Sequence, residues 1–512
     1  MPDILLATLN AKFIHASFGL RCLLANMGDL MPTTELCEFD INQRSLDIAE
    51  SILAKHPKII GFGVYIWNVV ETRSVLSIIK RIRPDLIIIL GGPEVSYESI
   101  GQPILELCDH VLTGEADVAF YRLCHDLLAF IPGSHEIPKI IHSPLPDLNA
   151  LKSPYPYYSD SDIKNRLIYV EASRGCPFTC EFCLSSLDIP VRQFPLKQFL
   201  ADLTQLFDSG ARHFKFVDRT FNLHLPTSTE ILSFCLERAH QGLFSHFEMV
   251  PDRLPEALRT IISKFPPGSL QFEIGVQTFD PEVSENISRR QNLARLEENF
   301  RFLRSNTSVH IHADLIAGLP GETMESFACG FDRLFKLHPQ EIQVGILKRL
   351  KGTPISRHEV AYTLIYADEP PFEILSTSTM NFESLQRLRR FARYWDLVGN
   401  SGNFTQSTAS IANANESPFY SFQKFADWLY AKTKRTHGIA LNTLSELIFR
   451  YLTEQLLLPM AEAANVLWQD YQASQRSEIP PFLRPWLAPQ KSFVKKTSRS
   501  VRFSERQDRR VT

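Results

Sequence analysis

The chain has 512 residues, a length that favours two or three domains. Hydrophobic residues make up 44% and charged residues 22%, which is typical of a globular protein, and a net charge of −3 gives no overall reason to expect nucleic acid or an anionic membrane as partner. The N-terminus lacks the basic flank and apolar core of a secretory signal, and the longest apolar runs are only strand-length. We therefore expect a cytoplasmic protein.

Residues 1–146 alternate short apolar strands with amphipathic helices. The expected strands are Ile4–Leu9, Leu36–Phe39, Ile59–Val64, Leu86–Leu90 and His110–Leu112. Continuous apolar strands separated by helices predict a parallel sheet covered on both faces, here a flavodoxin-like, Rossmann-type α/β domain. Such folds bind ligands beyond the carboxyl ends of their strands, where this chain carries glycines that let a ligand approach the backbone.

A second βα series is expected over residues 167–356, after a Pro- and Tyr-rich linker at 147–166 that packs on a surface. Its strands are predicted at Leu167–Glu171, His213–Val217, Phe247–Val250, Leu270–Val276, Val309–Ile316 and Ile342–Leu347. Six strands alternating with helices indicate a partial (β/α)6 TIM barrel, with its chemistry at the C-terminal ends of the strands.

Residues 357–490 are predicted to form a mainly helical domain, with its clearest helices at Phe382–Leu397, Phe419–Lys432 and Leu441–Glu454. Residues 491–512 contain eight Lys or Arg and two acidic residues. Such a run is typical of a disordered basic tail, and a nucleic-acid contact there is the alternative.

Three of the nine cysteines, Cys176, Cys180 and Cys183, follow the first strand of the second series. An odd number of cysteines in a short loop does not suit a disulfide framework, so the three indicate ligands of one inorganic centre. A cubane iron–sulfur cluster normally takes four thiolates, and three would leave one iron open. The alternative is a structural zinc site, but no fourth Cys or His follows Cys183 at short spacing. The other cysteines lie in apolar contexts, which suits a reducing cytosol.

The Cys-x3-Cys-x2-Cys spacing, with the aromatic Phe182 before the last cysteine, resembles the radical S-adenosylmethionine (SAM) superfamily. The resemblance implies a [4Fe-4S] cluster on the three cysteines whose free iron binds SAM, with Phe182 near the cofactor. It further implies that an electron from the cluster splits SAM into methionine and a 5′-deoxyadenosyl radical. An electron donor such as a flavodoxin or ferredoxin is then expected as a partner.

Residues 213–222 resemble the second strand of that core, which contacts the methionine end of SAM. Asp218, Arg219 and Thr220 stand in place of the usual Gly-Gly-Glu, and the resemblance makes them SAM contacts. Arg219 would neutralise the methionine carboxylate or, alternatively, pair with Asp218.

Two later segments resemble the fourth and fifth strands of the coproporphyrinogen-oxidase and elongator-like branches. In residues 271–278, Glu273 and Gln277 are the implied ribose contacts, and a salt bridge inside the barrel is the alternative for Glu273. In residues 314–323, Gly318 and Glu322 are the implied adenosine contacts, and a favourable acid at a helix N-terminus is the alternative for Glu322.

The N-terminal unit resembles the cobalamin-binding domain found ahead of this core in many radical enzymes, on residues 61–63, 91–94 and 114–117. The resemblance implies cobalamin contacts at Thr8, Asn10, His15, Gly63, Gly91, Gly92, Pro93, Glu94, Gly114 and Glu115. One departure concerns His15, because the Asp-x-His-x-x-Gly motif of the histidine-ligated domains is incomplete around it. The alternatives are cobalamin held without a histidine ligand and a domain that has lost the corrinoid.

The helical C-terminal region resembles a domain of unknown function that follows these two modules in one bacterial subgroup, with the junction at 347–354. Together the modules predict a cobalamin-dependent radical SAM enzyme that methylates an unactivated carbon of an unknown small molecule. Two alternatives stay open. One is a cyclisation, rearrangement or oxidation without methyl transfer, and the other is a non-catalytic sensor that binds a cluster and a corrinoid.

Overall fold

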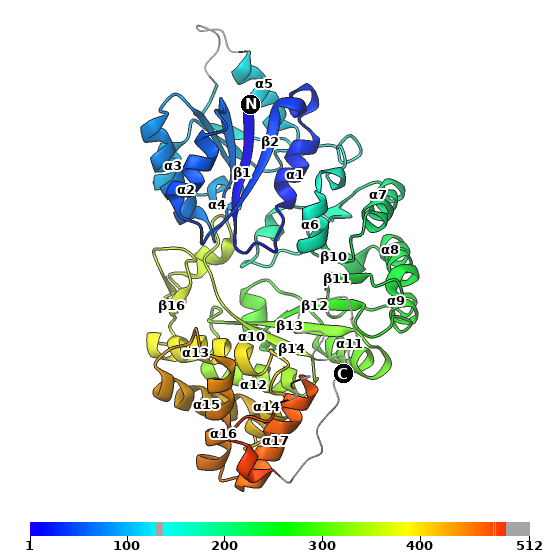
Figure 1. The fold of residues 1–512 in the computed structure, drawn as a ribbon, viewed down its shortest axis with the longest axis vertical. Helices are drawn as coiled ribbons and strands as arrows, with labels where there is room; N and C mark the ends of the chain where they lie inside the picture. Colours follow the sequence, from blue (N-terminus) through cyan, green and yellow to red (C-terminus); the bar gives the residue numbers. More distant parts are fainter. Residues whose placement is uncertain (130–136, 475, 477, 488–512) are drawn as a thin grey trace. The chain divides into compact units, whose positions relative to one another are not determined.

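The computed structural model describes residues 1–129, 137–474, 476 and 478–487 (Figure 1). The chain divides into two compact units. The first unit contains residues 1–219, 348–356 and 367–373, and the second contains 220–347, 357–366 and the remainder from 374. The predicted basic tail at 491–512 lies outside the described residues. Among the residues described, no helix combines the length and the apolar character needed to cross a membrane.

The first unit opens with a six-stranded parallel sheet in the order β2-β1-β3-β4-β5-β6. The strands are β1 (Ile4–Asn10), β2 (Thr34–Asp40), β3 (Ile59–Gly63), β4 (Ile87–Gly91), β5 (His110–Thr113) and β6 (Ile140–His142), and the helices are α1 (Phe18–Ala25), α2 (Ser45–Leu53), α3 (Val69–Ile82), α4 (Pro93–Ser96) and α5 (Ala119–Leu128). This confirms the predicted flavodoxin-like α/β architecture, since the order of the first five strands is the one such folds use.

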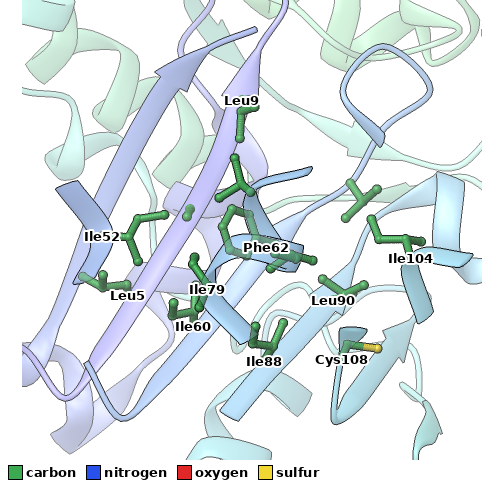
Figure 2. Packing of buried hydrophobic residues seen from close by; sticks show 14 of the residues in the cluster. Leu5, Leu9, Ile52, Ile60, Phe62, Ile79, Ile88, Leu90, Ile104 and Cys108 are labelled. Carbon is green, nitrogen blue, oxygen red and sulfur yellow. The ribbon is translucent and has the colours of Figure 1, made fainter. Parts of the chain in front are cut away.

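Each face of this sheet buries its own hydrophobic core. One core joins alternate residues of β1, β3 and β4 to helices α2 and α3, as Figure 2 shows for Leu5, Ile60 and Ile88 with Ile52 and Ile79. The other core packs the opposite strand faces against α1 and α5. Two covered faces explain why these strands read as continuous apolar runs.

The remainder of the first unit carries the cysteine loop. It contains α6 (Asp160–Asn165), β7 (Ile168–Val170), β8 (Ser173–Arg174), β9 (Arg192–Gln193), α7 (Leu196–Asp208) and β10 (His213–Phe216). Strands β7 and β10 pair in parallel, whereas β8 and β9 form a short antiparallel pair. The three cysteines lie between β8 and β9, so this small hairpin closes the base of their loop.

The second unit continues the βα series with four parallel strands in the order β14-β13-β12-β11. Its strands are β11 (Phe244–Met249), β12 (Leu270–Gln277), β13 (His310–Ala317) and β14 (Glu341–Ile346), and its helices are α8 (Leu225–Ala239), α9 (Glu256–Ile262), α10 (Pro281–Asn286), α11 (Leu293–Asn306) and α12 (Met324–Phe335). All six strands predicted for the barrel series are present. The division between the units falls within the series, after β10.

The C-terminal part of the second unit is helical, as predicted. It contains the short strands β15 (Ile365–Tyr366) and β16 (Ile374–Ser376), followed by α13 (Phe382–Val398), α14 (Thr405–Ala412), α15 (Pro418–Thr433), α16 (Leu441–Glu454) and α17 (Met460–Ala473). Its core is aromatic: Trp395 meets Phe422 edge to face at 4.8 Å between ring centroids, and Phe331 of α12 meets Trp395 at 4.9 Å. The helical region is thereby packed onto the last helix of the strand series.

Candidate cofactor site

The cysteine loop is held closed by its own backbone. The N–H of Cys176 donates to the carbonyl of Asp188 at 2.9 Å, across the two arms of the loop. Gly175 has φ +91°, and a Cβ there would lie 2.6 Å from the Pro190 oxygen and 2.8 Å from the Asp188 oxygen. Only glycine lets the two arms approach this closely just before the first cysteine.

The three cysteines lie on this one loop. Cys176 and Cys180 are buried and Cys183 is partly exposed. Burial raises the pKa of Cys176, and the charges of Cys183 and Cys180 raise it further, whereas Arg219 lowers it. Thiolates that raise one another's pKa gain from a shared metal centre, which neutralises them, so the donor set suits an iron–sulfur cluster.

Within the described part of the chain, no three His, Cys, Asp or Glu side chains are close enough together to bind a metal ion as they stand. This includes the three cysteines. Their role as cluster ligands therefore stays a prediction. Phe182 is half-buried on the same loop.

Asp218, which follows β10, is hydrogen-bonded to the residues that follow β7. Its carboxylate accepts the backbone N–H of Ala172 at 3.0 Å and the hydroxyl of Ser173 at 2.5 Å. Burial raises the pKa of Asp218 to about 6, partly offset by these hydrogen bonds. Its position is fixed by the chain itself, whereas the next residue, Arg219, lines a cavity. Thr220 is buried at the start of the second unit.

A cavity of about 480 Å³ lies at the carboxyl ends of β3, β4 and β5. Its opposite wall comes from the base of the cysteine loop, through Glu171, Ser173, Arg174, Gly175 and Asp188. Of the residues predicted to contact cobalamin, it brings together Gly63, Gly91, Gly92, Pro93, Gly114 and Glu115. The glycines leave one wall without side chains, as a large planar cofactor requires, so the residues present fit a corrinoid.

Four other predicted cobalamin contacts are not among the residues that line this cavity, namely Thr8, Asn10, His15 and Glu94. Thr8 donates to the Gly63 carbonyl at 2.8 Å, and Asn10 donates to Glu38 at 2.9 Å. Nδ1 of His15 lies 2.7 Å from the Tyr169 hydroxyl, and burial, Lys215 and Lys12 lower its pKa.

Glu94 is only 4% exposed and pairs with Lys351 at 2.6 Å. Asn10, His15 and Glu94 thus bond to residues that do not line the cavity, whereas Thr8 bonds to the backbone of Gly63, which does. The role of His15 in binding cobalamin stays a prediction.

Arg174 is the site residue that the sequence analysis missed. Its guanidinium contacts Glu171 at 3.0 Å, Glu115 at 2.7 Å and Asp117 at 2.8 Å. Arg192, across the hairpin from Arg174, also pairs with Glu115. Both strands at the base of the cysteine loop are thus joined by ion pairs to the residues that follow β5. In the sequence, the only indication of this role of Arg174 was its position two residues before Cys176.

Replacing Arg174 with leucine is expected to lower the free energy of unfolding by about 3–5 kcal/mol, because it leaves buried carboxylates unpaired. Burial already raises the pKa of Glu171 to about 7 although Arg174 lowers it. The matched control is Asp188→Asn, which removes a half-exposed carboxylate 3.3 Å from Arg192. It should lower the free energy of unfolding by less than about 1 kcal/mol. Urea denaturation of the metal-free chain, followed by circular dichroism, measures both, and equal losses would contradict the proposed role of Arg174.

In the second unit, Glu273 pairs with His246 at 3.0 Å. This geometry matches the alternative of a salt bridge inside the barrel. Gln277 ends β12 with φ +69°, a backbone conformation rare outside glycine. Its role in binding SAM stays a prediction.

Glu322 is 1% exposed, and its carboxylate accepts the N–H of Gly318 at 3.1 Å. Burial raises its pKa well above the usual range. Thr323, not Glu322, caps α12, through reciprocal hydrogen bonds with Ser326. Glu322 therefore fixes the loop after β13.

Three sequence families match this chain. "B12 binding domain" matches residues 4–123, "Radical SAM superfamily" matches 170–328, and "Protein of unknown function (DUF4080)" matches 360–510. Among curated proteins, the cobalamin-dependent radical SAM methyltransferase TokK of Streptomyces tokunonensis is 22% identical over 355 residues. The match covers 61% of this chain but only half of that relative.

Two solved structures share the fold. The cobalamin-dependent S-adenosylmethionine radical enzyme OxsB, with aqua-cobalamin bound, has a TM-score of 0.60 at 14% identity, covering 95% of this chain and 84% of that one. The radical SAM methyltransferase TsrM from Kitasatospora setae, with cobalamin and a [4Fe-4S] cluster bound, has a TM-score of 0.55 at 16% identity, covering 72% and 78%. From its three matched domains and the fold that it shares with these proteins, the chain belongs to the cobalamin-binding radical SAM enzymes that carry a C-terminal domain of unknown function.

Proposed function

We propose that this chain transfers a methyl group to an unactivated carbon of a small-molecule substrate. The observation that carries the proposal is the cavity at the carboxyl ends of β3, β4 and β5, whose opposite wall is the base of the cysteine loop. A corrinoid in this cavity and a cluster on the loop would lie in one compact unit. The methyltransferase names of TokK and TsrM support the same outcome.

In this proposal the bound cofactors supply the difficult chemistry: reductive cleavage of SAM at the cluster and a methyl group carried on cobalt. The chain positions and shields these groups. Gly63, Gly91 and Gly114 keep the cavity wall free of side chains, and Arg174 fixes the cysteine loop to that wall. Arg219, which lines the same cavity, supplies a positive charge that suits the carboxylate end of SAM.

The remaining predicted partners belong to this proposal. A reduced flavodoxin or ferredoxin would supply the electron. The oxygen-sensitive cluster and the absence of disulfides among the described cysteines suit a reducing cytoplasm.

Product analysis with the anaerobically reconstituted enzyme tests the proposal. With a true substrate, we expect both 5′-deoxyadenosine and S-adenosylhomocysteine, because remethylation of cobalamin consumes a second SAM. Formation of 5′-deoxyadenosine with no S-adenosylhomocysteine would overturn methyl transfer in favour of cyclisation, rearrangement or oxidation. Absence of both products under strong reduction, with the cluster present, would favour the sensor.

A further inference from the structure

A second, smaller cavity adjoins the cofactor cavity within the first unit. Its volume is about 240 Å³, which is below the size of a drug-sized pocket. It shares five side chains with the larger cavity: Phe18, Cys22, Asp117, Glu171 and Arg174. The linker, the end of the β8–β9 hairpin and the start of α7 form its other walls, and we call it the inner chamber.

Asp202 of α7 lines the inner chamber and is only 7% exposed. Its carboxylate accepts one hydrogen bond, from the side-chain amide of Gln198 at 2.9 Å. No Lys, Arg or His side chain in the described ranges forms an ion pair with it. A buried carboxylate normally has a cationic partner, so this one is unusual.

The two cations that line the chamber do not fill this role. Arg174 is engaged by Glu115, Asp117 and Glu171. Lys152 is exposed and forms no ion pair with Asp202. The chamber therefore holds the Asp202 carboxyl group without a cationic side-chain partner among the described residues.

A second polar group without a partner belongs to a residue of the chamber wall. Ser153, on the linker, lines the chamber, and its hydroxyl oxygen is buried and has no hydrogen-bond partner among the described residues. Four aromatic residues, Phe18, Tyr155, Phe194 and Phe199, contribute to the remaining walls, together with aliphatic residues and the carboxylates of Asp117 and Glu171 that Arg174 already pairs. An occupant should therefore offer hydrogen-bond donors and a positive charge at one end and an apolar body at the other.

We propose that the inner chamber binds a small organic ammonium ion. Its N–H groups would donate to the Asp202 carboxylate and the Ser153 hydroxyl, and its body would lie against the aromatic walls, which also attract a cation. A hard divalent cation fits poorly, because it requires six or more oxygen ligands or a shell of retained waters. This inference is independent of the methyl-transfer proposal, since the chamber needs neither cofactor.

Calorimetric titration of the full-length chain with benzylamine tests the proposal, and benzyl alcohol serves as the neutral match. We expect saturable binding of the amine and at least about tenfold weaker binding of the alcohol, because the charge-assisted hydrogen bonds are lost. Asp202→Asn should weaken benzylamine binding by at least about tenfold and leave that of the alcohol little changed. Asp208→Asn, an exposed carboxylate on the same helix, is the control and should bind as the parent does.

Ser153→Ala is a second variant, which keeps the Asp202 side chain. We expect it to weaken benzylamine binding several-fold. The amine site would be refuted by equal affinity for amine and alcohol, or by a folded Asp202→Asn chain that binds benzylamine unchanged. The absence of saturable benzylamine binding to the parent chain would likewise refute the amine site. Repeating the titration with cobalamin-loaded protein then tests whether the shared residues Glu171 and Arg174 couple the two cavities.

Discussion

Replacing Cys180 with serine is expected to abolish the iron–sulfur absorption of the reconstituted protein and to reduce 5′-deoxyadenosine formation to that of a protein-free control. The physical reason is the donor set. Cys176, Cys180 and Cys183 supply only three thiolates, and a cubane that reserves one iron for SAM has no spare ligand. Iron content, the visible spectrum and product analysis under strong reduction measure the effect.

Cys329→Ser provides the matched control, because this thiol is exposed and lies in the second unit. Its iron content and its cleavage of SAM should equal those of the parent chain. A Cys180→Ser protein that keeps a full cluster and cleaves SAM would contradict the assignment of the three ligands.

Replacing Gly91 with leucine is expected to weaken cobalamin binding by about tenfold to a hundredfold, because the new side chain projects into the cofactor cavity. The backbone tolerates the change, since a Cβ at Gly91 would meet nothing closer than the Leu112 oxygen, at 3.6 Å. Gly91→Ala should lie between the parent and the leucine variant. Cobalt retained after gel filtration measures the loss.

The cluster serves as the internal control for the Gly91 variants, since iron content should stay unchanged while cobalt falls. Parallel loss of both metals would indicate misfolding. Full cobalt retention in Gly91→Leu would place the corrinoid elsewhere and overturn the assignment of this cavity.

The N-terminal parallel sheet was predictable because central strands such as β3 and β4 are buried on both faces and therefore read as apolar runs. Strand β6 was missed because its three residues are mostly exposed and carry no such pattern. Helix α14 was missed for a similar reason: Ser and Thr dominate it, and its position depends on Asp470 of α17, which accepts the N–H of Gln406 at 2.7 Å and the Ser407 hydroxyl at 2.6 Å.

At the site, spacing was enough to identify the cysteine loop and the glycines at the strand ends, since both are local patterns. The partners of long or charged side chains were not predictable, because they come from distant parts of the chain. Arg174 forms ion pairs with Glu115 and Asp117, almost sixty residues earlier in the sequence. Glu273 pairs with His246 on the neighbouring strand. The ion-pair partner of Glu94, Lys351, is further away still in sequence.

The ion pairs at the base of the cysteine loop limit how freely the N-terminal α/β domain can be exchanged for that of another protein. A shortened chain beginning at residue 167 would lose Glu115 and Asp117, so that Arg174 would keep only Glu171 and Arg192 only Asp188 as an acidic partner. A graft of a foreign N-terminal domain would succeed only if it placed carboxylates at the equivalent loop. Any exchange of these domains therefore has to keep carboxylates opposite Arg174 and Arg192.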